Sequence, residues 1–397
     1  MGTNGAGAAA TQDMEMAEAS APSGGVLPAD VVSSIDTTAQ RLSSQRKPKS
    51  KRKPPTGYST TDDVSAFSQV KSLPSMHSTK PPGVTALAFS ANGKWALTGG
   101  ADKQVQIYDR ESDKVVATLK GHTKKITRVA FEPAQDVEIG AEVAGAFPNP
   151  TFAVSASEDK TVKIWRANED GSKWAVAHTL SGFKDAITGL DVHPNGKLLG
   201  AASRDSTWAL YDIGSGKALL SIDAPPAGSE AEQEAAGGYQ YESLAFHPDG
   251  QLLATGTKEG AIRVWDVKTA GKVETFRGGS SAPIAALSFS ENGYYLAAAA
   301  KGTNIVQVWD LRKLSVAGSI DLGADAQVSS IKFDPSAQFL AVVGTDARVY
   351  ANKSWALLYT FDGNTAEITS ADWDSRDGSL VTASLDRTLR VLGKADA

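Results

Sequence analysis

Three short stretches decide the fold. Residues 84–89 read VTALAF, residues 126–131 read ITRVAF and residues 368–373 read ITSADW. In each stretch apolar residues lie two apart, which is the pattern of a half-buried β-strand. Similar strands recur at intervals of 40 to 61 residues and end at Phe89, Phe131, Val192, Phe246, Phe289, Phe333 and Trp373. A period of this length predicts an array of seven like units.

Each unit continues in the same order. A turn such as Asn92-Gly93 or Asp249-Gly250 follows most of these strands and supplies the positive φ of a tight reversal. A strand of small residues comes next, for example residues 97–100, and a further strand ends in an aromatic residue such as Tyr108. The units therefore predict an all-β protein.

An acid precedes the last aromatic or aliphatic residue of most units by six positions. Examples are Asp102, Asp159, Asp205 and Asp386. A carboxylate in a reverse turn accepts backbone N–H bonds and fixes the turn, so we expect a structural role for all four. His122 is placed to meet Asp159, and Trp165 ends a strand of the same unit. We expect structural roles for His122 and Trp165 as well.

These features resemble the WD-repeat family, and the resemblance covers about four fifths of the chain. It implies four-stranded blades around a central channel, so seven units give a seven-bladed β-propeller over residues 66–397. The last unit lacks one strand, and residues 66–80, with Phe67–Leu73 as the strand, are expected to close the ring. Two long intervals between repeats predict surface insertions at residues 137–150 and 224–238. Trp208 is expected to pack within the blades.

A closer resemblance is to the pre-mRNA-processing factor 19 family. It rests on residues outside the generic repeat, as well as within it: Leu97–Lys103, Ala117–Lys125, Thr207–Ala209, Ser290–Ala297 and Val308–Leu314. The resemblance implies a location in the nucleus, membership of the NineTeen complex of the spliceosome, and roles in pre-mRNA splicing and DNA repair. It also implies ubiquitin-protein ligase activity toward substrate proteins.

That family carries its ligase activity on an N-terminal U-box and forms tetramers through a coiled coil. The first 80 residues here show neither a compact apolar pattern of U-box size nor sustained heptads. We therefore expect this chain to bind partners as a monomer and leave enzymatic activity open. An adaptor for an unrelated nuclear complex is the alternative.

The segment before the repeats has three parts. Residues 1–26 are rich in Ala, Gly, Ser and Thr and are expected to be a disordered tail. Residues 27–65 contain a short amphipathic helix after Pro28, which needs a partner surface, and a basic linker. The cations of this linker fit a solvated linker, a nuclear-localisation signal or an RNA contact: Arg46, Lys47, Lys49, Lys51, Arg52 and Lys53.

The amino-acid composition limits the kinds of site that the chain can form. The chain has no cysteine and five histidines without metal-ligand spacing, so we expect no metal, no cofactor and no catalytic residue. No apolar run is long enough to cross a membrane. The net charge is −5, and the repeats hold the acidic excess, which argues against general phosphate binding by the body of the chain.

Binding is therefore expected in the loops at the ends of the ring. Cations lie beside the turn acids and in the loops that enter the second and third units. We expect these cations to share one rim and to bind an acidic peptide or an RNA-associated protein, with simple solvation as the alternative. They are Lys103, Lys124, Lys125, Lys160, Lys184, Arg204, Lys258 and Arg387.

Overall fold

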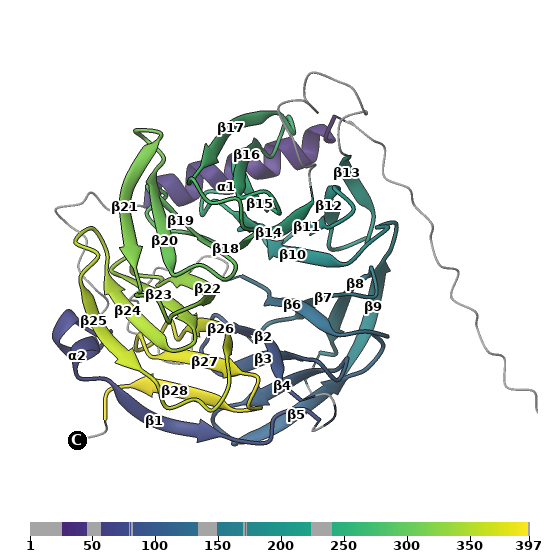
Figure 1. Cartoon of the computed structure of the whole chain (residues 1–397). Helices are drawn as coiled ribbons and strands as arrows, with labels where there is room; N and C mark the ends of the chain where they lie inside the picture. Colours follow the sequence, from purple (N-terminus) through teal and green to yellow (C-terminus); the bar gives the residue numbers. More distant parts are fainter. Residues whose placement is uncertain are drawn as a thin grey trace, which may run out of the picture.

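The computed structural model describes residues 26–45, 57–78, 80, 82–133, 149–169, 171, 173–223 and 240–395. Seven four-stranded antiparallel sheets stand around a central axis as the blades of a propeller (Figure 1). The all-β, seven-bladed fold predicted from the repeats is confirmed. Residues 1–25 of the predicted tail and all six cations of the basic linker lie outside the described residues.

The first strand of each blade contacts the first strands of both neighbouring blades around the axis. From blade 1 to blade 7 these strands are β2 (Val84–Phe89), β6 (Ile126–Phe131), β10 (Ile187–Val192), β14 (Tyr241–Phe246), β18 (Ile284–Phe289), β22 (Val328–Phe333) and β26 (Ile368–Trp373). Each has a register shift after its first residue, such as that between Val84 and Ala86. A bulge of this kind bends the strand and leaves one residue out of the ladder.

The second strands are buried along almost their whole length. They are β3 (Trp95–Gly100), β7 (Phe152–Ser157), β11 (Leu198–Ser203), β15 (Leu252–Thr257), β19 (Tyr295–Ala300), β23 (Phe339–Gly344) and β27 (Leu380–Ser384). Their small residues have a packing reason, because a Cβ on Gly99 would collide with Ile126 of the next blade.

The third and fourth strands lie progressively farther from the axis. The third strands are β4 (Val105–Asp109), β8 (Val162–Ala167), β12 (Trp208–Asp212), β16 (Ala261–Asp266), β20 (Ile305–Asp310), β24 (Ala347–Ala351) and β28 (Leu389–Gly393). The fourth strands of blades 1 to 6 are β5 (Lys114–Leu119), β9 (Trp174–Leu180), β13 (Ala218–Ile222), β17 (Lys272–Arg277), β21 (Ser315–Asp321) and β25 (Leu357–Phe361).

Blade 7 takes its outer strand from the other end of the chain. β1 (Ser68–Leu73) pairs antiparallel with β28, and the sheet order is β1-β28-β27-β26. Figure 1 shows the earliest strand beside the last three. This is the place that the sequence analysis gave to the strand after Phe67.

The two helices pack on the propeller. In α1 (Ala29–Gln45), Ile35 is fully buried in a cluster with Trp208 of blade 3 and Trp265 of blade 4. Trp208 is itself fully buried, in agreement with blade packing. The propeller thus supplies the partner surface that the amphipathic helix needs.

The short helix α2 (Thr61–Ser65) leads into the closing strand. A capping box between Thr60 and Asp63 fixes its start, and Val64 is fully buried in a cluster with residues of blades 6 and 7. Just before it, the Tyr58 hydroxyl donates to the Asp334 carboxylate at 3.1 Å. These contacts tie the segment before β1 to the ring.

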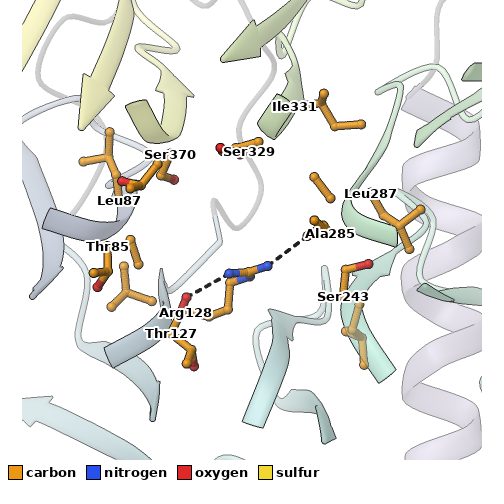
Figure 2. A pocket seen from close by; sticks show the side chains of 16 residues that line it. Thr85, Leu87, Thr127, Arg128, Ser243, Ala285, Leu287, Ser329, Ile331 and Ser370 are labelled. Atoms are coloured by element: carbon orange, nitrogen blue, oxygen red, sulfur yellow. Dashed lines mark hydrogen bonds between the residues drawn. The ribbon is translucent and has the colours of Figure 1, made fainter. Parts of the chain in front are cut away.

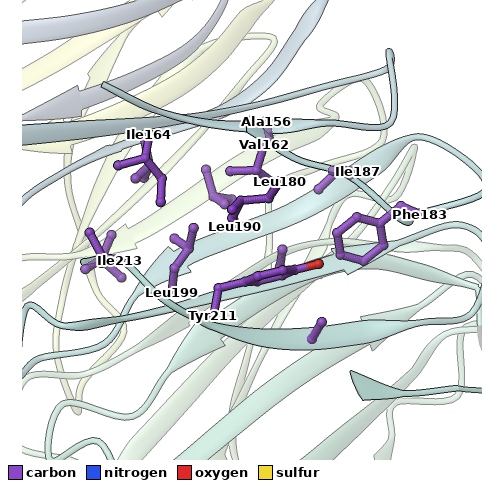
Figure 3. Close-up of a cluster of buried hydrophobic side chains, with 14 of the residues drawn as sticks. Ala156, Val162, Ile164, Leu180, Phe183, Ile187, Leu190, Leu199, Tyr211 and Ile213 are labelled. Carbon is purple, nitrogen blue, oxygen red and sulfur yellow. The ribbon is translucent and has the colours of Figure 1, made fainter. Parts of the chain in front are cut away.

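The core consists of apolar clusters between adjacent blades. Figure 3 shows the cluster shared by blades 2 and 3, in which Phe183 and Tyr211 lie with their ring centroids 6.2 Å apart. Each blade therefore buries its faces against its neighbours, as repeat architectures require.

Candidate partner-binding rim and central channel

One end of the ring carries the turns between second and third strands and the connections into the first strands. Backbone hydrogen bonds join these two sets of loops, for example from Glu158 N to Lys125 O at 3.0 Å and from Lys258 N to Gln240 O at 2.8 Å. We call this end the lysine rim. All eight cations that the sequence analysis selected lie in its loops.

Six of the eight cations are exposed lysines. Lys103 and Lys160 are in turn positions with φ of 71° and 72°. Lys125 lies 3.9 Å from the carboxylate of Glu158, which is a weak exposed pair. The remaining five make no ion pair with any part of the chain that the structure describes: Lys103, Lys124, Lys160, Lys184 and Lys258.

The two arginines of the set have partners within the chain. Arg204 donates through Nε and Nη2 to both carboxylate oxygens of Glu242 at 2.9 Å, and this pair joins blades 3 and 4. Arg387 donates through Nη2 to the carbonyl oxygen of His77 at 3.2 Å. These guanidinium groups stabilise the loops of the rim, so the exposed charge available to a partner comes from the lysines.

A chain of hydrogen bonds supports the rim in blade 2. Nδ1 of His122 lies 2.8 Å from the Asp159 carboxylate, and its Nε2 lies 2.8 Å from the Ser155 hydroxyl, which also accepts from Trp165 Nε1 at 2.8 Å. Burial by itself raises the pKa of Asp159, but the hydrogen bonds with His122, Thr161 and the Thr123 amide outweigh it and lower the pKa. The arrangement holds the turn at Asp159.

A second histidine of this kind was missed by the sequence analysis. In blade 1, Nδ1 of His77 lies 3.0 Å from the Asp102 carboxylate and its Nε2 lies 2.9 Å from the Thr98 hydroxyl. The signal was present, because His77 precedes the first unit as His122 precedes the second. No glycine precedes His77, and the insertion in blade 2 makes the two histidine-to-acid separations unequal.

The other two turn acids also accept backbone N–H bonds. Asp205 accepts from Thr207 N at 2.9 Å, and Asp386 accepts from Thr388 N at 2.9 Å. Asp386 further binds Arg390 at 2.9 Å. All four acids therefore act in the turns where the sequence placed them.

Hydroxyl groups join neighbouring first strands around the channel. Thr85 donates to the Ile126 carbonyl at 2.7 Å, and Thr127 donates to the Ile187 carbonyl at 2.6 Å. Corresponding bonds run from Thr188 to Tyr241, from Ser243 to Ile284 and from Thr369 to Val84. The bulge leaves Thr85, Thr127, Thr188 and Thr369 out of the ladder so that they reach the next blade, whereas Ser243 is paired with Gly256 of its own blade.

The channel contains a cavity of about 100 Å³ (Figure 2). Arg128 of β6 extends into it and donates to the carbonyl oxygens of Thr127 at 2.9 Å and of Ala285, on β18 of blade 5, at 3.0 Å. From sequence, residues 126–131 are predicted to be a plain strand, with no role for Arg128.

Other kinds of site find no support in the described residues. They contain no group of three or more His, Cys, Asp or Glu side chains able to hold a metal ion. None of their helices is long and apolar enough to cross a membrane.

Comparison with protein families agrees with this architecture. The model of the WD domain, G-beta repeat, matches residues 68–109, 113–166 and 355–391. The model of the nucleolar protein 10-like N-terminal domain matches residues 174–353. Together the two matches extend over the whole propeller.

Several curated proteins with similar sequences are named pre-mRNA-processing factor 19. The chain is 34% identical over 358 residues to pre-mRNA-processing factor 19 of Oryza sativa subsp. japonica, covering 89% of this chain and 62% of that protein. It is 33% identical over 372 residues to pre-mRNA-processing factor 19 homolog 2 of Arabidopsis thaliana, covering 92% and 64%. The Bos taurus protein of this name is 33% identical over 261 residues, covering 66% and 46%.

The chain thus spans somewhat less than two thirds of the length of the two plant relatives and less than half of that of the Bos taurus protein. The repeats, the seven blades and the WD family model agree on the fold. The chain is therefore a seven-bladed β-propeller with WD repeats, and it is similar to proteins named pre-mRNA-processing factor 19.

Proposed function

We propose that this protein is a scaffold of nuclear pre-mRNA processing and that its lysine rim binds acidic segments of protein partners. The observation that carries the proposal is similarity to pre-mRNA-processing factor 19 over 89% of the chain. By resemblance, the partners are spliceosomal proteins of the NineTeen complex.

The rim supports the second half of the proposal. Five exposed lysines without an ion-pair partner in the described part of the chain lie at one end of the ring, although the chain as a whole is acidic. Like charges held on rigid turns attract an acidic segment and speed its association. The docking of α1 leaves this end open, because Asp36 of α1 binds Lys268 in the β16–β17 turn, at the opposite rim.

The test is capture of partners from ribonuclease-treated nuclear extract by the tagged chain. Lys103, Lys160 and Lys258 are changed to Glu in one variant, and the matched control changes Lys197, Lys217 and Lys353, which are exposed at the opposite rim. We expect spliceosomal proteins with the native chain, at least a tenfold loss with the first variant and little change with the control.

Three outcomes contradict the proposal or a part of it. Capture of no spliceosomal protein removes the role in pre-mRNA processing. Equal losses in both triple variants remove the lysine rim as the docking surface. Capture that disappears only on ribonuclease treatment favours RNA contact through the basic linker over protein binding.

A further inference from the structure

The cavity in the channel has a single ionisable side chain among the sixteen residues that line it, and that side chain is Arg128. Its two hydrogen-bond partners are backbone carbonyl oxygens, which carry no net charge. A guanidinium group has five N–H donors, so the two carbonyls leave most of its donors available. The lining residues therefore hold a cation with no paired anion.

The carboxylate of Glu242 does not neutralise this charge. Glu242 attracts Arg128, but both of its oxygens accept from Arg204 at 2.9 Å. Burial lowers the pKa of Arg128 and Arg204 lowers it further, while Glu242 opposes them. A buried cation whose charge is only partly balanced by a neighbouring acid is stabilised when an anion enters its cavity.

The residues at the position of Arg128 in the first strands of the other blades are small. Arg128 is the third residue of its first strand, and the third residues of the seven first strands are Ala86, Arg128, Gly189, Ser243, Ala286, Ser330 and Ser370. Small neighbours leave space for the long side chain, and Figure 2 shows it lying across the opening between β6 and β18. The space is therefore built around one cation.

Hydroxyl donors complete the site. Five hydroxyl side chains in the lining already donate to other groups: Thr85, Thr127, Ser243, Ser329 and Thr369. Ser330 and Ser370 line the same cavity and make no side-chain hydrogen bond within the described residues. The cavity thus offers one guanidinium fork and two unused hydroxyls.

We propose that this cavity is a binding site for one tetrahedral oxyanion of the phosphate type, held by Arg128, Ser330 and Ser370. Arginine binds phosphate oxygens through paired N–H bonds, and hydroxyls suit the remaining oxygens. A cavity of about 100 Å³ admits a single phosphate group but not a nucleoside. The ion is either free phosphate or the phosphate monoester at the tip of a side chain.

The experiment is calorimetric titration of the full chain with inorganic phosphate in a buffer of chloride salts. We expect one saturable site and at least a tenfold loss of affinity in Arg128→Gln. The Ser330→Ala/Ser370→Ala double variant should lose roughly tenfold as well, since each hydrogen bond contributes about 0.5–1.5 kcal/mol. Lys217→Gln, which removes an exposed cation at the opposite rim, is the control and should bind as the native chain does.

A second variant and a second titrant extend the experiment. If Arg128→Gln does not fold, Arg128→Lys keeps the charge without the fork and should bind several times more weakly. Titration with O-phosphoserine distinguishes the two sources: binding that requires Arg128 indicates a monoester, and refusal beside phosphate binding indicates the free ion. Absence of a saturable site, equal binding by Arg128→Gln, or acetate binding as tight as phosphate would overturn the proposal.

Discussion

The hydroxyl of Thr369 in blade 7 donates to the carbonyl oxygen of Val84 in blade 1 at 2.7 Å. The same hydroxyl lies 3.1 Å from the Ala383 carbonyl of its own blade. This is the bond of the hydroxyl series that joins the last blade to the first. It complements the pairing of β1 with β28, so the ring is fastened both at the axis and at its outer edge.

Replacing Thr369 with Val removes the bond while keeping the side-chain shape and the strand propensity. The Val84 carbonyl then lacks its partner, and we expect the free energy of unfolding to fall by about 1–3 kcal/mol. Urea denaturation measures the loss. Thr360→Val in the exposed part of β25 is the control, and an equal effect of both changes would contradict the role given to Thr369.

Removing the closing strand tests the ring directly. A chain that starts at Met76 loses β1, and with it the buried side chains of Val64 and Phe67. Because full burial of each contributes about 1.5–3 kcal/mol, we expect at least about 3 kcal/mol of lost stability and an unpaired β28. A chain that starts at Gly57 keeps β1 and is the comparison. Equal thermal unfolding of the two chains would show that β1 does not stabilise the ring.

Asp159 makes the stability of blade 2 depend on pH. An unfolded aspartate titrates near pH 3.9, and the pKa of the folded Asp159 lies below that value. Its contribution is therefore complete well above pH 4 and declines as the pH falls through 4 toward the folded pKa. Asp159→Asn should cost about 1–3 kcal/mol at pH 7 and progressively less below pH 4.

Denaturation of both proteins from pH 7 to pH 3 measures this difference. Asp362→Asn, an exposed position without a side-chain hydrogen bond in the described residues, should show a small and nearly constant difference. A gap for Asp159→Asn that widens toward pH 3 has the wrong sign and would exclude this explanation.

The docking of α1 depends on Ile35. Ile35→Ala removes a fully buried side chain from the cluster with Trp208, and such changes cost about 2–5 kcal/mol. Because the helix can detach without opening the ring, we expect faster hydrogen exchange in α1 and unchanged exchange in blade 1. Gln40→Ala, on the exposed side, should leave both rates unchanged. Uniformly faster exchange in every blade would refute local detachment.

The repeats made the fold predictable from sequence, because seven strand signals of one kind admit few architectures. The shortage of one strand after Leu392 likewise pointed to a partner near Phe67. The docking surface of α1 was not predictable, since an apolar helix face shows that a partner is needed but not which groove fits. A role for Arg128 was not predicted, because its strand was interpreted from the alternation of apolar residues alone. Among the third residues of the seven first strands, Arg128 is the one long cationic side chain and the others are small.

The pairing of β1 with β28 also sets an order of events during synthesis. Residues 68–73 leave the ribosome before any of the blades, but their partner at residues 389–393 is translated only after the other six blades. Blades 1 to 6 contain only strands that are consecutive in the chain and can therefore form as they emerge. The final blade must bring together segments that are distant in sequence, and contacts of that kind form slowly. Until then the nascent chain is an open arc whose two unsealed ends expose backbone and apolar surface, which makes this interval the one in which chaperones have most to protect.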